Sequence, residues 1–387
     1  MDIAGGVYKE SCLVPEWNAE YGSGGRAAAA IAALSPGVIL HTYASTPHSS
    51  GLDALTSLGV DVRVHPASHG IAFAYFHPLS NPHIEPRRHA ITRHAPIQVS
   101  AEAVLRFGFL EGDAVVTANR AVHDPQTFVE PERFAANGSR AEELALVLNE
   151  EEARALSGEH DVRDAARALL HYERAEVVVV KAGVRGALVA ERGGDMTEVP
   201  AYRSDRVFKI GTGDVFSSVF AFEWAERKRG APEAATLASQ SVSRYCSTRR
   251  LPLSADPFLP GRPVIVDGPP VVLLVGETAT IGQRYVMEEA RYRLNELGAT
   301  VVSPALDAIQ QVDAKILTSA LFVADAASAD LESQLQRLLD ENVPIVLFDE
   351  RVGSEAPTQG VESRVCAIDD FASAVYFAFW AASPKRA

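Results

Sequence analysis

Short runs of β-branched residues alternate with helix-like stretches along this chain, and this alternation constrains the fold more than any other feature. Val177–Lys181 reads VVVVK, which is typical of a strand buried on both faces of a sheet. Further strands are predicted at 37–41 and 114–117, and helices at 26–34, 142–156 and 162–170. Because strands that alternate with helices usually run parallel, the sequence predicts an α/β fold with helices on both faces of a parallel sheet.

Two segments break the alternation. Residues 61–97 have period-two character without intervening helices, so a small antiparallel sheet that projects from the main body is expected there. Residues 251–270 contain six prolines, which remove amide donors and block helix formation. We therefore divide the chain into a large domain (1–255), a linker (256–270) and a smaller domain (271–387).

The smaller domain repeats the α/β pattern on a reduced scale. Strands are predicted at 271–275, 300–302, 320–324 and 344–348, and helices at 281–297, 331–342 and 371–382. Such a pattern favours a doubly wound domain of about five strands.

Charge and cysteine content exclude several partners. The chain has 36 Lys and Arg against 50 Asp and Glu, a net charge of −14, which disfavours nucleic acid and anionic lipid. Its three scattered cysteines suit a reducing compartment. It has neither a signal-like N-terminus nor an apolar stretch of about 18 residues, so a cytoplasmic protein without a membrane span is expected.

The segment KIGTGDVF at 209–216 carries the clearest chemical signal. The backbone amides of Gly211, Thr212 and Gly213 can face one concavity, and a helix begins directly after them. Amides at a helix N-terminus form an anion hole, which phosphoryl transfer requires. Asp214, at the mouth of the helix, would be the catalytic base that takes a proton from an acceptor hydroxyl. The alternative is that Asp214 only caps a helix.

GTGDVFSSVFAF resembles the glycine-rich signature of the ribokinase-like (PfkB) carbohydrate and nucleoside kinases. Gly24 and Gly25, before an alanine-rich helix, look like the family's substrate-binding glycine pair, and Glu10 lies where the family binds substrate hydroxyls. The resemblance covers about residues 1–255. It implies a ribokinase-like parallel sheet with a small β lid at 61–97.

Two further segments resemble the family's ATP-binding parts. Asn149 and Glu152 match an N-x-x-E motif, which implies that they lie near Mg²⁺ and phosphate, with Glu152 as the magnesium carboxylate. VVVVKAGVRGALV resembles the strand and turn beside the nucleotide, which implies ATP-binding roles for Lys181, Gly183 and Gly186. The alternative for Asn149–Glu152 is an ordinary helix start whose acidic first turn complements the helix dipole.

The chain also departs from the family pattern. Phe208 and Lys209 stand where the family often has Asp-Thr, so the family's monovalent-cation site is in question. Lys209 or Lys181 would supply a fixed positive charge instead, or each is a solvated surface lysine.

The start of the smaller domain, VVLLVGETATIGQRYVMEEARYRLNELGATVVSP, resembles nucleoside 2-deoxyribosyltransferase-like domains. Glycosyl transfer needs a carboxylate nucleophile and a second acid, and the candidates are Asp325, Asp330 and Glu332. Gln334 stands where the family's glutamate is expected, so this domain is predicted to keep a nucleotide-sized cleft whether or not it keeps the chemistry.

Together these features predict a kinase that uses ATP and Mg²⁺ to phosphorylate a hydroxyl of a sugar or nucleoside. The alternatives are nucleoside N-glycosidase or deoxyribosyltransferase activity in the smaller domain, and a non-catalytic nucleotide sensor. An exposed edge of the lid sheet predicts pairing into a homodimer. A salt bridge that buries Asp214, or glycine amides that face away from any cavity, would overturn the kinase assignment.

Overall fold

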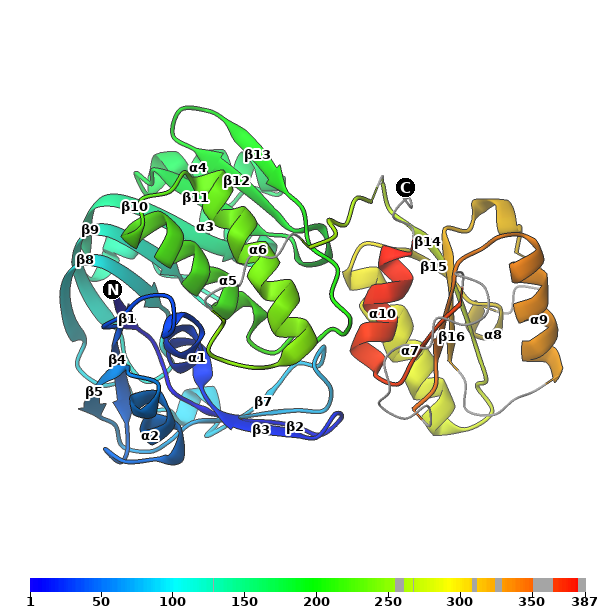
Figure 1. Ribbon diagram of the computed structural model, residues 1–387, viewed down its shortest axis with the longest axis horizontal. Helices are drawn as coiled ribbons and strands as arrows, with labels where there is room; N and C mark the ends of the chain where they lie inside the picture. Colours follow the sequence, from blue (N-terminus) through cyan, green and yellow to red (C-terminus); the bar gives the residue numbers. More distant parts are fainter. Residues whose placement is uncertain are drawn as a thin grey trace. The chain divides into compact units, whose positions relative to one another are not determined.

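The computed structural model describes residues 1–127, 129–254, 261–266, 268–307, 312–323, 329–350 and 365–381, with the side chains of 329–332 excepted (Figure 1). It divides into two compact units, one of residues 1–204 with 209–262 and one of residues 205–208 with 263–387. The predicted linker, 256–270, falls partly on residues 256–260 and 267, which lie outside the described part of the chain.

The first unit is built on a nine-stranded sheet in the order β13-β12-β11-β10-β9-β8-β1-β4-β5. Seven of its strands are mutually parallel: β1 (Asp2–Ala4), β4 (Ile39–Ala44), β5 (Asp61–Pro66), β8 (Ile97–Phe107), β9 (Ala114–Asp124), β10 (Arg140–Asn149) and β11 (Val177–Lys181). β12 (Ala187–Glu191) and β13 (Met196–Val199) continue the sheet in antiparallel pairing. The predicted α/β fold is therefore present in this unit.

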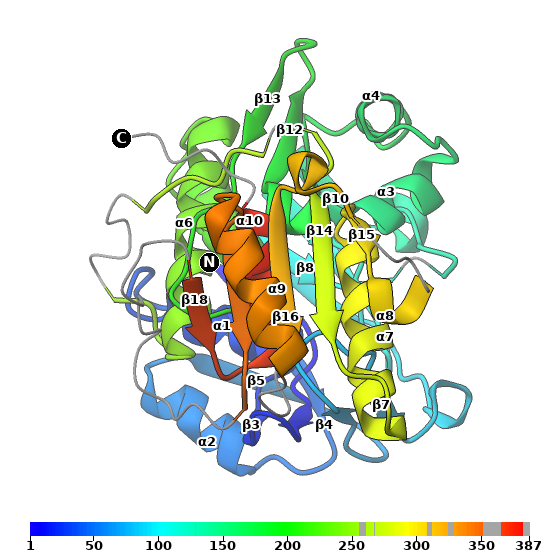
Figure 2. The same ribbon diagram turned by 90° about the vertical axis from the view of Figure 1, so that its right-hand side faces the viewer.

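Helices cover both faces of this sheet. Figure 2 shows α1 (Gly22–Ile31) and α6 (Ala231–Thr248) on one side, and α3 (Glu150–Ser157) and α4 (Val162–Tyr172) on the other. α5 (Thr212–Ala221) packs between α1 and α6, and α2 (Ser50–Ser57) lies next to α1. Fully buried alanine and leucine side chains of α4 belong to the same core as Val178 and Val180 of β11, and Val177 and Val179, which alternate with them, are buried as well.

The predicted helix at 142–156 is wrong in its first half. Residues 140–149 form β10, which pairs with β9 and β11, and the helix begins at Glu150. Glu142 and Glu143 favour a helix, but the run from Leu144 to Leu148 is buried between two parallel neighbours. Burial at the centre of a sheet outweighs a weak local helix preference.

The lid sheet also differs from the expectation. Its order is β3-β2-β6-β7, formed by β2 (Lys9–Cys12), β3 (Trp17–Glu20), β6 (Ala72–Tyr75) and β7 (His83–Glu85). Residues 61–66, expected in the lid, instead form β5 at the edge of the large sheet. The lid is mixed rather than antiparallel, because β2 and β6 run parallel. Alternation in a sequence indicates a strand but not the sheet that it joins.

The second unit contains five parallel strands in the order β15-β14-β16-β17-β18. They are β14 (Val271–Gly276), β15 (Thr300–Val302), β16 (Ser319–Val323), β17 (Ile345–Phe348) and β18 (Val365–Ile368). α7 (Ile281–Glu296) and α10 (Phe371–Trp380) contact each other on one face, and α9 (Ala329–Asp340) covers the opposite face (Figure 1). This strand order is that of flavodoxin-like α/β sheets. About five strands were predicted here, and β18 is the one whose position the sequence did not indicate.

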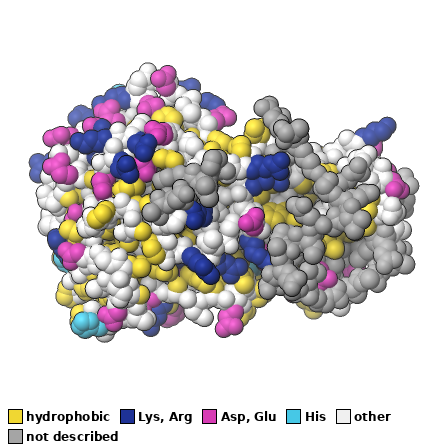
Figure 3. Space-filling model, viewed as in Figure 1, with side chains coloured by type: hydrophobic (Ala, Val, Ile, Leu, Met, Phe, Trp, Pro, Cys, Tyr) yellow, Lys and Arg dark blue, Asp and Glu magenta, His cyan; other side chains and the backbone are white. Residues whose placement is uncertain are grey.

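Two surface properties concern partners. On the face drawn in Figure 3, acidic and basic side chains are interspersed over the first unit. Among the described residues, no helix combines the length and apolar character that crossing a membrane requires.

Candidate active site

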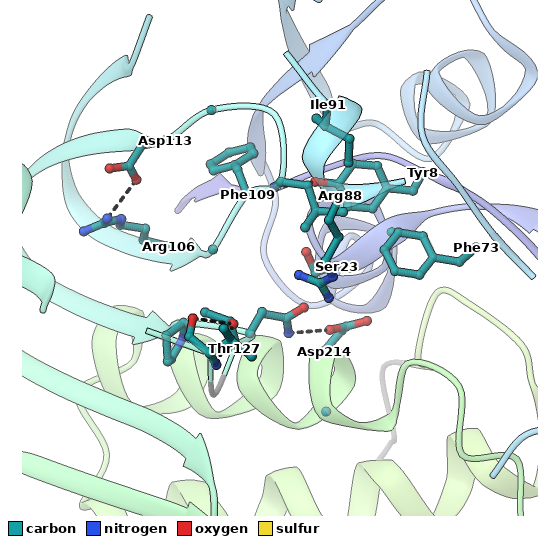
Figure 4. A pocket seen from close by; sticks show the side chains of 18 of the residues that line it. Tyr8, Ser23, Phe73, Arg88, Ile91, Arg106, Phe109, Asp113, Thr127 and Asp214 are labelled. Carbon is teal, nitrogen blue, oxygen red and sulfur yellow. Dashed lines mark hydrogen bonds and ion pairs between the residues drawn. The ribbon is translucent and has the colours of Figure 1, made fainter. Parts of the chain in front are cut away.

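A cavity of about 570 Å³ lies in the first unit (Figure 4). Its walls come from the lid sheet, from the N-terminus of α1, from the segments that follow β8 and β9, and from the N-terminus of α5. Because carboxyl ends of parallel strands converge at one edge of a sheet, ligands usually bind there. Four of the predicted site residues line this one cavity: Glu10, Gly211, Gly213 and Asp214.

The glycine turn ahead of α5 agrees only in part with the predicted anion hole. Gly211 has φ +78°, a left-handed conformation that favours glycine, and a Cβ there would lie 2.1 Å from Nε of Arg26. Gly211 and Gly213 line the cavity, whereas Thr212 is buried and its amide donates to the carbonyl of Lys209 at 3.3 Å. The expectation of three amides in one anion hole is therefore wrong for Thr212.

Asp214 lies in a buried salt bridge. Nη1 of Arg26 donates to Oδ2 of Asp214 at 2.9 Å, and Nη2 of the same guanidinium donates to Oε2 of Glu10 at 2.6 Å. Arg26 is 1% exposed, and the rings of Trp17 and Tyr21 lie 5.9 and 5.5 Å from its guanidinium carbon. The salt bridge that was set out above as evidence against the kinase assignment is therefore present, but it occupies only Oδ2 of Asp214.

The second oxygen of Asp214 faces Gln126. Nε2 of Gln126 donates to Oδ1 of Asp214 at 3.0 Å, as the dashed line in Figure 4 shows. Gln126 is exposed and has φ +58°, which is uncommon outside glycine and is often found at functional sites. Of the two donors to Asp214, Gln126 is therefore the one that an incoming hydroxyl can replace.

The substrate-binding predictions around Glu10 are only partly met. Both Glu10 oxygens already accept hydrogen bonds, from Arg26 and, at 3.3 Å, from the amide of Gly22. Burial raises the pKa of Glu10, and Arg26 opposes the rise. Gly24 allows α1 to approach the backbone, since a Cβ there would lie 2.4 Å from the carbonyl oxygen of Gly5. The cavity is lined by Gly22 and Ser23 rather than by the expected pair Gly24 and Gly25.

A second charged cluster lies behind the glycine turn. Nζ of Lys181 donates to Oδ2 of Asp124 at 2.7 Å, and Oγ of Ser217 donates to the same oxygen at 2.6 Å. A Cβ on Gly213 would lie 3.6 Å from Nζ of Lys181, so this ammonium group is beside the N-terminus of α5. Oδ1 of Asp124 is buried without a hydrogen-bond partner among the described residues. Nζ of Lys209 donates to Oγ1 of Thr212 at 3.2 Å.

Asn149 and Glu152 form a reciprocal helix cap. Oδ1 of Asn149 accepts from the amide of Glu152, and Oε2 of Glu152 accepts from the amide of Asn149, both at 2.8 Å. The helix-start interpretation is confirmed, while their role toward Mg²⁺ stays a prediction. Burial and the nearby charge of Asp124 raise the pKa of Glu152 to about 7, with Lys181 opposing the rise.

The remaining predicted residues do not line the cavity. Gly183 and Gly186 shape the turn after β11, where both have positive φ. Asp325 lies outside the described residues, and Asp330 and Glu332 belong to α9 in the segment whose side chains are not described. The side chains of all three catalytic residues predicted for the smaller domain therefore lie outside the described part of the chain.

Sequence reasoning missed Arg26, Gln126, Asp124 and Ser217. Only Arg26 carried a usable signal, because it is a lone charge after the glycine pair at the start of an otherwise small-residue helix. Its contact with Asp214 spans 188 positions in the chain, and no local pattern encodes such a pairing.

Comparison with known proteins gives one family match. Residues 144–249 match the model of the pfkB family carbohydrate kinases. No curated protein matches the chain.

Solved structures similar to this one include three kinases. Ribokinase from Thermotoga maritima is 17% identical, covers 67% of this chain and 96% of its own, and gives a TM-score of 0.47. The fructokinase of Vibrio cholerae O395 is 15% identical, with 64% and 93% coverage and a TM-score of 0.46. Aminoimidazole riboside kinase from Salmonella enterica is 16% identical, with 64% and 94% coverage and a TM-score of 0.47. TM-scores at this level carry no conclusion about the present chain.

The family match includes the reciprocal cap at Asn149, Lys181 at the end of β11, the glycine turn and Asp214. Of these groups, Lys181, the glycine turn and Asp214 lie together at the N-terminus of α5, while the cap lies at the start of α3. Over residues 144–249 the chain is therefore similar to the pfkB family carbohydrate kinases, and the match supports a ribokinase-like carbohydrate kinase domain in the first unit.

Proposed function

We propose that the first unit transfers the γ-phosphoryl group of ATP to a hydroxyl of a sugar or nucleoside. One observation carries this proposal: Gly211, Gly213 and Asp214, at the N-terminus of the ten-residue helix α5, line one cavity beneath the lid sheet. A helix N-terminus attracts phosphoryl oxygens, and a carboxylate beside it can receive the proton of an acceptor hydroxyl. The match to the carbohydrate kinase model supports the same activity.

In the proposed reaction, the acceptor hydroxyl replaces Gln126 on Oδ1 of Asp214. The hydroxyl oxygen then bonds to the γ-phosphorus, the bond from that phosphorus to the bridging oxygen of ADP breaks, and the hydroxyl proton passes to Asp214. Arg26 stays on Oδ2 at 2.9 Å and fixes the orientation of the carboxylate. Because Arg26 occupies only Oδ2, the other carboxylate oxygen, Oδ1, can accept the proton of the acceptor hydroxyl.

The cations behind the glycine turn would hold the phosphates of ATP. Lys181 lies beside Gly213, and Lys209 beside Thr212. Mg²⁺, when bound with ATP, neutralises phosphate charge and needs few protein ligands. The residues present fit that need, because Oδ1 of Asp124 has no partner among the described residues, and the pKa of Glu152 is raised by burial and then by the nearby charge of Asp124.

A second candidate is a protein that binds a nucleotide or sugar without turnover. The observation that favours it is the environment of Asp214, whose two oxygens both already accept hydrogen bonds, one from a fully buried arginine. The two candidates differ in whether bound ATP is consumed.

A panel of sugars and nucleosides with ATP and Mg²⁺, assayed for ADP formation, separates them. The kinase proposal predicts turnover of at least one acceptor and a loss of about 10²–10⁴-fold in kcat for Asp214→Asn. Glu130→Gln is the matched control, since Glu130 also lines the cavity but is exposed. Unchanged turnover in Asp214→Asn removes the base role. Nucleotide binding without turnover of any acceptor by the wild type supports the second candidate.

For the second unit we propose a nucleoside 2-deoxyribosyltransferase-like domain. Its support is the five-stranded parallel sheet together with the sequence resemblance of residues 271–304. Incubation of the full chain with nucleosides, followed by chromatography, tests for activity there. Release of free base that persists in Asp214→Asn assigns that chemistry to the second unit, and no release indicates a domain without it.

A further inference from the structure

The segment after β7 contributes two arginines to the wall of the cavity. Arg88 lies in the short helical turn Arg88–Ala90, and Arg93 follows it. Figure 4 shows the side chain of Arg88 directed into the cavity beside Ser23. Arg88 is exposed, and among the described residues its side chain has neither a hydrogen-bond nor an ion-pair partner. Arg93 donates to the carbonyl oxygen of Gly112 at 3.2 Å and pairs with no carboxylate in the described part of the chain.

The buried acids of the cavity already have partners. Glu10 and Asp214 share Arg26, and Asp113 accepts from Arg106 at 2.8 Å. The other two acidic residues that line the cavity, Glu130 and Glu132, are exposed to solvent, where charge interactions are weak. No acid in the described part of the chain pairs with Arg88, although Glu10 and Asp214 share one guanidinium and so leave an excess of one carboxylate near the cavity.

Ser23 is the second part of the same subsite. It is 6% exposed, lines the cavity, and its hydroxyl has no hydrogen-bond partner among the described residues. Ser23 is the second residue of the ten-residue helix α1, whose N-terminus carries partial positive charge. A guanidinium, a free hydroxyl and a helix N-terminus thus meet at the wall of the cavity, where Figure 4 draws Arg88 and Ser23 next to each other.

We propose that the phosphoryl acceptor carries an anionic group, a carboxylate or a phosphate, which binds Arg88 and Ser23 while its hydroxyl meets Asp214. This proposal rests on the proposed kinase function and narrows its substrate class to sugar acids or sugar phosphates. Arginine binds both groups through paired hydrogen bonds. Arg88 is exposed, so its guanidinium can exchange water for such a group, and the buried hydroxyl of Ser23 offers that group a second partner in a fixed position.

The test compares acceptors in pairs on the full chain, with ATP and Mg²⁺ present. The neutral probes are ribose, fructose and inosine, and the anionic probes are gluconate, ribose 5-phosphate and fructose 1-phosphate. We expect kcat/KM to be highest for an anionic probe. A hydrogen bond to a charged group contributes about 1.5–3 kcal/mol, so Arg88→Ala is expected to lower kcat/KM for that probe about 10- to 150-fold.

Arg87→Ala is the matched control, because Arg87 is the adjacent exposed arginine but does not line the cavity. It removes the same charge and is expected to change kcat/KM less than about twofold, as for surface charges in general. Arg88→Lys keeps the charge without the paired geometry and is expected to recover part of the loss. An equal loss in Arg87→Ala and Arg88→Ala would overturn the subsite.

Two further results overturn the proposal while the kinase function stands. One is efficient phosphorylation of a neutral probe that Arg88→Ala does not change. The other is a rise in the KM of ATP alone, which assigns Arg88 to the donor phosphates. Titration calorimetry without ATP tests whether the subsite exists when no acceptor is phosphorylated. If gluconate or ribose 5-phosphate binds to the wild type but not to Arg88→Ala, and neither is turned over, the result supports the subsite and refutes the kinase function. Preference between those two probes distinguishes carboxylate from phosphate.

Discussion

Replacing Arg26 by methionine removes the guanidinium that balances two buried carboxylates. In the native structure its nitrogens lie 2.6 Å from Oε2 of Glu10 and 2.9 Å from Oδ2 of Asp214, and Arg26 is 1% exposed. Removing one partner of a buried ion pair costs about 3–5 kcal/mol, because a buried charge stays without compensation. For a domain of this size each kcal/mol lowers Tm by about 2–4 °C, so we expect a fall of about 6–20 °C.

The assay is thermal unfolding of the full chain at several pH values. Burial already raises the pKa of Glu10, and loss of Arg26 raises it further. A carboxyl group with a raised pKa in the folded state keeps its proton there to a higher pH than in the unfolded chain. The folded variant therefore loses stability as the pH rises. The deficit of Arg26→Met relative to the wild type is expected to be smaller at pH 5 than at pH 8.

Two comparisons make this prediction sharp. Arg63→Met breaks the exposed pair with Asp61 and is expected to change Tm by less than about 2 °C. Adding Glu10→Gln to Arg26→Met removes one of the orphaned charges and is expected to restore part of the lost stability. A fall of less than 2 °C for Arg26→Met, or a deficit that does not depend on pH, would refute the assignment of Arg26 as the shared counter-charge.

Three other changes test separate parts of the site. Gly211→Ala places a methyl group 2.1 Å from Nε of Arg26. In chemical denaturation it is expected to cost more stability than Gly138→Ala, because Gly138 has a similar positive φ but open space around it. Equal costs would mean that Arg26 can move aside. Lys181→Met leaves Asp124, which is 1% exposed, without its cation. We expect the free energy of unfolding to fall by about 3–5 kcal/mol and ATP to bind more weakly in calorimetry. Unchanged values of both quantities would contradict the account. Glu152, with a pKa of about 7, keeps its proton in the folded state to a higher pH than in the unfolded chain, so stability should fall between about pH 5 and 8. Glu152→Gln should flatten this dependence of Tm on pH. Parallel Tm profiles of the wild type and the variant would show that Glu152 does not titrate in this range.

Much of the fold could be predicted because its strongest signals are local. Val177–Lys181 is a strand with the predicted bounds, and the helices near 26 and 162 appear close to where their sequence patterns place them. Both patterns follow directly from burial, either on two faces of a strand or on one stripe of a helix. The strand at 140–149 was missed because two glutamates hide a run that only its neighbours in the sheet bury.

The candidate site was predictable in its motifs but not in its contacts. The glycine turn and Glu10 meet at one cavity as the resemblance implied. The partners that decide the chemistry of Asp214 are 88 and 188 positions away in the chain, at Gln126 and Arg26. A lone charge in a helix start can be noticed in a sequence, but the carboxylate that it meets depends on how α1 and α5 pack.

The most direct measurement of the central claim is the kcat of Asp214→Asn, followed beside its dissociation constant for ATP, with whichever acceptor the wild type phosphorylates. We expect kcat to fall by about 10²–10⁴-fold while ATP binds with nearly the same affinity. A variant that turns over at close to the wild-type rate, or one whose loss comes entirely from weaker ATP binding, would contradict the claim that this carboxylate receives the acceptor's proton.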